Sequence, residues 1–169
     1  MNGAEGAVFD ALALVGFAKV DITGSAAWNE ADGWYGKLDS ALKPRPASYV
    51  FELFNRLALG SVVGATTEDA QAIVPLGVMS KSGKSLFLVN RTTGNLTLEL
   101  QGFDDRNTEA SQVTQAGMAQ VVLPTTGQVV LPAFRTFSPS IPERGLNALP
   151  MHFSPFGWAE TVSFSKEAR

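Results

Sequence analysis

The sequence predicts a mainly β protein: an antiparallel β-sandwich preceded by an α/β fragment with two helices. Within residues 1–60, two stretches carry apolar residues at helical spacing, and a short β-branched stretch and a loop separate them. From residue 61 on, short stretches of apolar or alternating residues are separated by turn sequences at hairpin spacing. Several short strands of this kind are typical of an antiparallel sandwich.

These patterns divide the chain into three parts. A helix–strand–loop–helix unit resembling the end of an α/β body occupies 1–60, and the β-sandwich occupies 61–138. A proline-rich tail follows at 139–169, in which 158–164 has strand-like alternation.

Composition places the chain among globular proteins and excludes several kinds of site. The 169 residues are 45% hydrophobic and 17% charged, which suits a packed domain. The net charge of −3 without a basic cluster argues against a nucleic-acid partner. No apolar run reaches the roughly 18 residues of a membrane span. Cysteine is absent and His152 is the single histidine, so we expect no thiol nucleophile, no metal site built from these residues and no cofactor.

Residues 1–20 are predicted to form an almost entirely apolar helix. Asn2 is expected to cap it, with Glu5 as the reciprocal acid of a capping box. Because apolar residues surround this helix, burial on more than one side is expected. The stretch has no basic n-region, so it does not have the pattern of a signal peptide. Both a cytoplasmic and an exported location remain open. Residues at helical spacing are Val8, Ala11, Leu12 and Val15.

A predicted strand at 20–27 and the loop that follows it contain the candidate binding residues. Helix, strand, loop and helix in this order are typical of an α/β barrel unit, whose chemistry lies at the C-terminal ends of the strands. Aromatic rings stack on a sugar and acidic groups accept hydrogen bonds from its hydroxyls, so the predicted ligand is an oligo- or polysaccharide. The alternative is that these rings fill a local core. The candidates are Trp28, Asn29, Glu30, Asp32, Trp34 and Tyr35.

The second helix and the strands follow from local patterns. Residues 47–59 are predicted to be an amphipathic helix, with Pro46 at its first turn and Gly60 as its stop. Its expected buried face consists of Val50, Leu53, Phe54 and Leu57. A linking strand is expected at 62–65, a three-stranded meander at 71–79, 85–90 and 96–100, and further strands at 111–116, 119–123 and 128–137.

Several motifs between about residues 7 and 138 occur together in one order. They are the strand end at Trp28, the Lys-Pro-x-Pro-Ala-x-Tyr sequence at 43–49, the Ser-Leu-Phe-Leu-Val-Asn strand at 85–90 and Leu-Pro-Ala at 131–133. As an ensemble they resemble the C-terminal part of clan A glycoside hydrolases, such as families 39, 51, 5 and 30. The resemblance implies the last β/α unit of a (β/α)8 barrel, followed by the C-terminal β-sandwich that braces it.

The resemblance also implies roles for single residues. Trp28 matches the tryptophan that ends the eighth strand and forms the floor of the sugar subsite, and the 28–39 loop would line that site. These enzymes retain anomeric configuration with two carboxylates about 5–5.5 Å apart, which follow the fourth and seventh strands. Asn29-Glu30 mimics the acid/base dipeptide, but it follows a strand that leads into the last helix. We therefore predict that the chain is not catalytic alone, with Glu30 as its one candidate acid/base.

Two further readings remain open. The β-sandwich is alternatively a stand-alone carbohydrate-binding module, with Trp34, Tyr35 or Trp158 as stacking platforms, or a structural interaction domain that docks on a separate barrel. The first helix separates these readings. Burial of 7–20 against the sandwich favours a domain that stands alone, whereas exposed apolar faces imply a missing or separate (β/α)8 barrel as partner.

Overall fold

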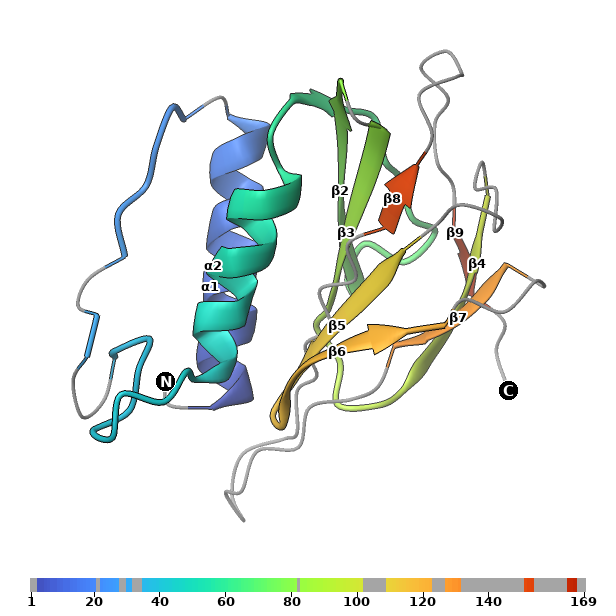
Figure 1. Cartoon of the computed structure of the whole chain (residues 1–169). Coiled ribbons are helices and arrows are strands. Elements are labelled where there is room, and N and C mark those ends of the chain that lie inside the picture. Colours follow the sequence, from blue (N-terminus) through green and yellow to red (C-terminus); the bar gives the residue numbers. More distant parts are fainter. Residues whose placement is uncertain are drawn as a thin grey trace.

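The structure is a computed structural model that describes residues 3–20, 22–27, 30–31, 35–81, 83–101, 109–122, 127–131, 151–153 and 164–166. Two helices and nine strands lie within these residues. Figure 1 shows the two helices side by side along one face of the β-strands. The prediction of a mainly β chain with two helices and antiparallel sheets is confirmed.

The two helices form one layer and run in the same direction. Helix α1 (Ala4–Lys19) and helix α2 (Pro46–Leu57) both ascend in Figure 1. The predicted capping box is wrong, because Gly3 is the N-cap of α1 and no side chain caps it. Pro46 occupies the first turn of α2 as expected, where its missing N–H costs no helical hydrogen bond. Helix α2 ends at Leu57, two residues before the predicted end.

Most of the strands belong to one antiparallel sheet of six. Its order is β1–β2–β3–β8–β5–β6. The bounds are β1 Ser61–Val63, β2 Ile73–Ser80, β3 Gly83–Asn90, β5 Ala110–Thr114, β6 Gly117–Val121 and β8 Met151–Phe153. Helix α1 packs on β2 and β3, and α2 packs on β5 and β6. The helix layer therefore covers one face of this sheet.

A second sheet holds three strands. Strand β4 (Leu96–Leu100) lies between β7 (Gln128–Leu131) and β9 (Phe164–Lys166). The predicted meander is thus wrong at its third strand, because β4 pairs with β7 and β9 rather than with β3. The predicted alternation within β4 is confirmed, since Leu98 and Leu100 are buried whereas Thr97 and Glu99 are exposed. The buried face of β4 packs against the larger sheet. Strand β4 therefore lies in the second sheet and does not extend the first one beside β3.

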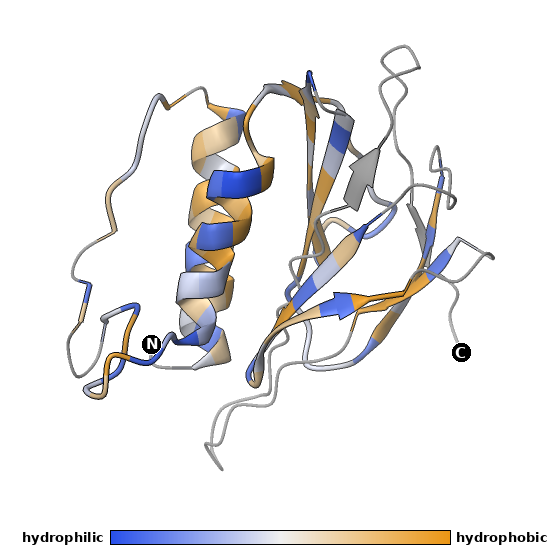
Figure 2. Ribbon diagram, viewed as in Figure 1, coloured by the Kyte–Doolittle hydropathy of each residue, from blue (hydrophilic) through white to orange (hydrophobic). Residues whose placement is uncertain are grey.

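Two apolar cores flank the six-stranded sheet, and β3 contributes to both. Phe87 and Val89 face the helices, whereas Leu86 and Leu88 face the smaller sheet, because alternate side chains point to opposite faces. Each such fully buried side chain stabilises the fold by roughly 1.5–3 kcal/mol. Figure 2 shows hydrophobic residues along both helices and along the strands of both sheets. The described helices include none long and apolar enough to cross a bilayer.

Candidate functional site

The segment between the helices does not form the strand expected at 20–27. Val20 is the C-cap of α1, and residues 22–27 lie in no strand and are exposed. The Ile22 N–H donates to the Phe17 carbonyl at 3.2 Å, which fixes where the segment leaves the helix. Figure 1 shows this blue segment running back along the helix pair, on the side away from the sheets. A strand needs a neighbour, and no described strand lies on that side.

The predicted sugar-binding loop is described in part. Trp28, Asn29, Asp32 and Trp34 lie outside the described residues. Glu30 is exposed, and its carbonyl accepts a hydrogen bond from the Leu38 N–H at 2.9 Å. Tyr35 is also exposed, at 57%. The backbone near Glu30 therefore folds back onto the chain that leads into α2, and both described candidates have side chains open to solvent.

Residues 36–45 form a hydrogen-bonded turn before α2. The Asp39 carboxylate accepts bonds from the N–H groups of Ala41 at 2.8 Å and Lys43 at 2.9 Å. The Lys43 N–H, followed by the Ala41 N–H and the charges of Lys43 and Arg45, holds the pKa of the Asp39 carboxyl below its usual value of 3.8. Leu42 adopts a left-handed backbone at φ 59°, which this turn imposes on it. These hydrogen bonds hold the turn in one conformation, so the turn fixes the positions of the residues on either side of it.

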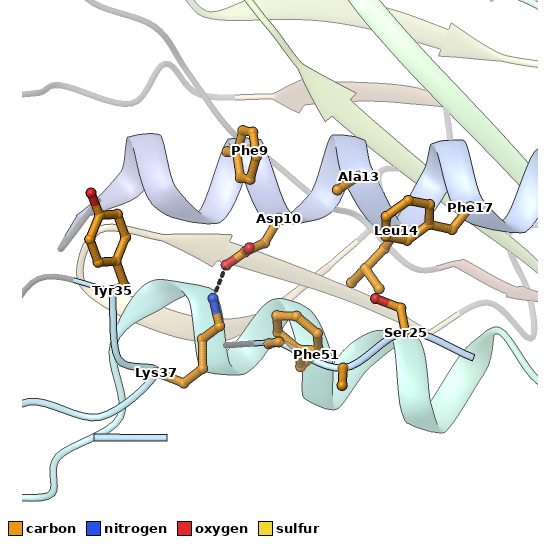
Figure 3. Close-up of a pocket in the computed structure, with 11 residues that line it drawn as sticks. Phe9, Asp10, Ala13, Leu14, Phe17, Ser25, Tyr35, Lys37 and Phe51 are labelled. Atoms are coloured by element: carbon orange, nitrogen blue, oxygen red, sulfur yellow. Dashed lines mark hydrogen bonds and ion pairs between the residues drawn. The ribbon is translucent and has the colours of Figure 1, made fainter. Parts of the chain in front are cut away.

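Lys37 joins this turn to both helices. Its Nζ lies 2.5 Å from Asp10 Oδ2 of α1, and the two side chains are 19% and 14% exposed. The same Nζ stands 5.1 Å from the centre of the Phe51 ring on α2. Figure 3 shows the ion pair bridging the space between the helices and the turn. Partial burial strengthens such a pair relative to one in open water.

An apolar hollow of about 450 Å³ opens beside this ion pair. Its walls come from α1, α2, the 22–27 segment and the start of the turn, as Figure 3 shows. Its volume lies in the range of about 300–1,000 Å³ that is common for binding pockets. The lining residues are Phe9, Asp10, Ala13, Leu14, Phe17, Ser25, Ala26, Ala27, Tyr35, Lys37 and Phe51.

Helix α1 therefore has two different apolar faces. Ala7, Ala11 and Val15 are buried in the core that α1 shares with α2 and the larger sheet. Phe9 and Phe17 lie on the other side, where 59% and 38% of their surface is exposed. The expected burial on more than one side is confirmed, because α1 packs on α2 and on strands β2 and β3, whereas the side with Phe9 and Phe17 is exposed. Sequence reasoning missed the hollow, although Phe9, Ala13 and Phe17 recur at a spacing of four residues and would have indicated a second stripe.

The described residues bring together no cluster of three or more histidine, cysteine, aspartate or glutamate side chains. Within these residues the site offers aromatic and aliphatic walls, one ion pair and tyrosine and serine hydroxyl groups. This arrangement suits binding through apolar contact. Comparison with protein-family models, with curated proteins and with solved structures finds no match to this chain.

Proposed function

We propose that this chain is the C-terminal part of a retaining glycoside hydrolase of clan A. In this proposal α1, the 22–27 segment and α2 belong to the end of a (β/α)8 barrel. The two sheets form the C-terminal β-sandwich that braces the barrel, and the chain is not catalytic alone.

The parallel direction of α1 and α2 is the observation that supports this proposal most. Two consecutive helices that run in the same direction need a return segment between them, and 22–27 is the first described part of that segment. In β/α architecture the return segment is a strand of a parallel sheet. The helix pair also has an exposed apolar side beside this segment, where such a sheet would pack.

The β-sandwich part of the proposal rests on the second core. Residues from β2 and β3 pack against residues from β4 and β7, so two antiparallel sheets share one apolar interior. The helix layer covers the opposite face of the larger sheet. A β-domain held in this way fixes the position of the last helix of a barrel.

The 28–39 loop is proposed to contact an oligo- or polysaccharide. Tyr35 stands exposed on the wall of the hollow, and Glu30 is exposed close by in sequence. A ring and a carboxylate of this kind suit sugar contact, whereas acid/base catalysis requires a second carboxylate about 5–5.5 Å away. Glu30 is therefore proposed as a substrate contact rather than as the catalyst.

Transcript sequencing upstream of the Met1 codon tests the proposal. We expect an in-frame reading frame that encodes further strand–helix units, with two glutamates at strand ends. An in-frame stop codon directly upstream would contradict the barrel proposal and would favour a stand-alone module.

Calorimetric titration of the full chain with cello-, xylo-, manno- and galacto-oligosaccharides tests the sugar contact. Tyr35→Ala is expected to weaken binding about threefold to tenfold, because a stacked ring contributes roughly 0.5–1.5 kcal/mol. Val130→Ala, an exposed change on β7, is the matched control and should leave the affinity unchanged. If none of the sugars gave a heat of binding, the proposal that the 28–39 loop contacts a saccharide would be contradicted.

One observation favours the second candidate, a stand-alone carbohydrate-binding or interaction module. The inner face of α1 is already buried on the larger sheet, so part of the apolar helix needs no partner. The exposed stripe on its other face favours the first proposal. The transcript experiment separates the two.

A further inference from the structure

We propose that Asn95 is an acceptor for an N-linked glycan and that Asn90 is not. Both residues begin an Asn-x-Thr sequence whose middle residue is not proline, so the sequence alone does not distinguish them. Their side chains, however, have opposite environments in the fold. Glycosylation at Asn95 is independent of the proposed function, but it requires an exported chain. The two sequences are Asn90-Arg91-Thr92 and Asn95-Leu96-Thr97.

Asn90 is fully buried, and its amide group is already used in hydrogen bonds. The Nδ2 atom, to which a glycan is attached, donates to the Gly94 carbonyl at 3.1 Å and to the Leu131 carbonyl at 3.4 Å. Attachment replaces one of the two Nδ2 hydrogens, so one of these bonds is lost. The sugar also needs space that the close-packed interior between the sheets lacks. A chain with a glycan on Asn90 therefore cannot close the core between its two sheets.

Asn95 lies directly before β4 and is exposed. Thr97, the other residue that the glycosyltransferase recognises, is exposed within β4, whereas its neighbour Leu98 is buried. Side chains two residues apart lie on the same face of an extended chain. Asn95 and Thr97 are therefore accessible together on the outer side of the smaller sheet, where a transferase reaches both of them.

A glycan on Asn95 lies away from the helix layer and from both cores. Figure 1 shows β4 in the smaller sheet, on the far side of the larger sheet from the helix pair. The outer face beside Asn95 includes Val130, which is opposite Thr97 in the β4–β7 pair and is 55% exposed. A bulky, polar glycan shields this apolar side chain from other chains and leaves the hollow open. The outer face of the smaller sheet is then a solvent-facing surface rather than a contact with another domain.

The modification is the transfer of an oligosaccharide from a lipid pyrophosphate donor. Asn95 Nδ2 forms a bond to C1 of the first sugar, and the bond between C1 and the pyrophosphate oxygen breaks. The lipid pyrophosphate leaves with the bonding electrons, and one Nδ2 proton passes to a carboxylate of the transferase. Asn95 thus supplies an accessible amide, and Thr97 supplies the hydroxyl group that the transferase recognises.

Translation of the full chain behind a cleavable secretory leader, in the presence of rough microsomes, tests this assignment. Electrophoresis before and after treatment with peptide N-glycosidase detects the glycans, and mass spectrometry locates them. Limited trypsin digestion in mild detergent then selects the folded chains. We expect the trypsin-resistant fraction to carry a glycan at Asn95 and none at Asn90. Chains that receive a glycan at Asn90 before they fold should be digested, because their core between the sheets stays open.

Variants separate recognition of the sequence from effects on folding. Asn95→Gln and Thr97→Ala should each lose the electrophoretic shift, whereas Thr97→Ser keeps a hydroxyl group and should retain it. Thr93→Ala, at an exposed position outside both sequences, is the matched control and should keep the glycan. Urea denaturation of the glycosylated wild type and of Asn95→Gln should give the same midpoint, because the glycan lies outside both cores.

Three results of these experiments would overturn the assignment. They are an unmodified Asn95 in the trypsin-resistant fraction, a glycan on Asn90 in that fraction, and a urea midpoint that the Asn95 glycan lowers. In the protein isolated from its natural source, mass spectrometry should find the glycan on the peptide that contains Asn95, and an unmodified peptide would also overturn it. None of these outcomes depends on the transcript or on the sugar titration, so the two proposals fail separately.

Discussion

Asn90 is the buried polar side chain that ties the two sheets together. Its Nδ2 donates to the Gly94 carbonyl at 3.1 Å and to the Leu131 carbonyl of β7 at 3.4 Å. Its Oδ1 accepts from both the N–H and the hydroxyl of Thr92 at 2.8 Å. The residue thus ends β3, shapes the turn at 91–95 and reaches the second sheet. Buried polar groups stabilise a fold only when their bonds are made, and here they are made.

Asn90→Asp is expected to lower the free energy of unfolding by about 1–3 kcal/mol. The new carboxylate cannot donate to the carbonyls of Gly94 and Leu131, and it would face them as an acceptor. Equilibrium urea denaturation measures the change. Thr93→Ala, at an exposed position of the same turn, is the control and should stay within about 0.5 kcal/mol of the wild type. Equal effects of the two variants would show that the Asn90 bonds do not hold the sheets.

Strand β1 depends on a close approach that tolerates no side chain at residue 60. A Cβ added to Gly60 would lie 2.1 Å from the Met79 carbonyl oxygen and 2.8 Å from its carbon. Ser61 is the first residue of β1 and pairs with the same Met79. The predicted role of Gly60 as a helix stop is therefore replaced by a steric one at the edge of the larger sheet.

Gly60→Ala is expected to cost about 1–3 kcal/mol, because the added methyl group meets backbone that cannot turn aside. Amide hydrogen exchange at 61–63 should accelerate as β1 separates from β2, and urea denaturation gives the total. Gly64→Ala lies just beyond the strand, where nothing is within 4 Å of the added Cβ, and is the matched control. Slow exchange at 61–63 in Gly60→Ala would contradict the steric explanation.

The elements that the sequence predicted well are those whose signal is local. Helix α2 follows from Pro46 and an amphipathic period, and the alternation of β4 follows from three leucines. Which strand β4 pairs with is not a local property, since a turn sequence permits either a hairpin or a change of sheet. The same holds for 20–27, where β-branched residues favour a strand but no described neighbour completes it.

The candidate site was predicted less well for a related reason. Tyr35 was chosen from the sequence and does line the hollow. Phe9, Phe17 and Phe51 were not chosen as binding residues, because aromatic residues on an apolar or amphipathic helix are usually part of the core. Which face of α1 meets the sheet depends on how α2 packs beside it. The sequence pattern alone does not settle that choice on a helix with apolar residues on both sides.

At the scale of the whole molecule, strands β2, β3 and β5 of the larger sheet are buried on both faces. The helix pair covers one face and the smaller sheet covers the other. The centre of the helix-facing core is the contact between Phe54 of α2 and Phe87 of β3, whose ring centres are 4.5 Å apart at 31°. Phe51 lies three residues before Phe54 and lines the hollow instead. Helix α2 thus offers two phenylalanines in different environments.

Phe54→Ala is expected to lower the free energy of unfolding by about 3–5 kcal/mol, because it removes the ring that contacts Phe87 and leaves a cavity in a closed core. Phe51→Ala should cost less than half as much, since its ring is half-buried and borders a hollow that already exists. Urea denaturation of both variants measures the difference with the same chemical change on one helix. If Phe51→Ala proved as costly as Phe54→Ala, the outer side of the helix pair would be a closed core, which would contradict an open hollow beside Phe51.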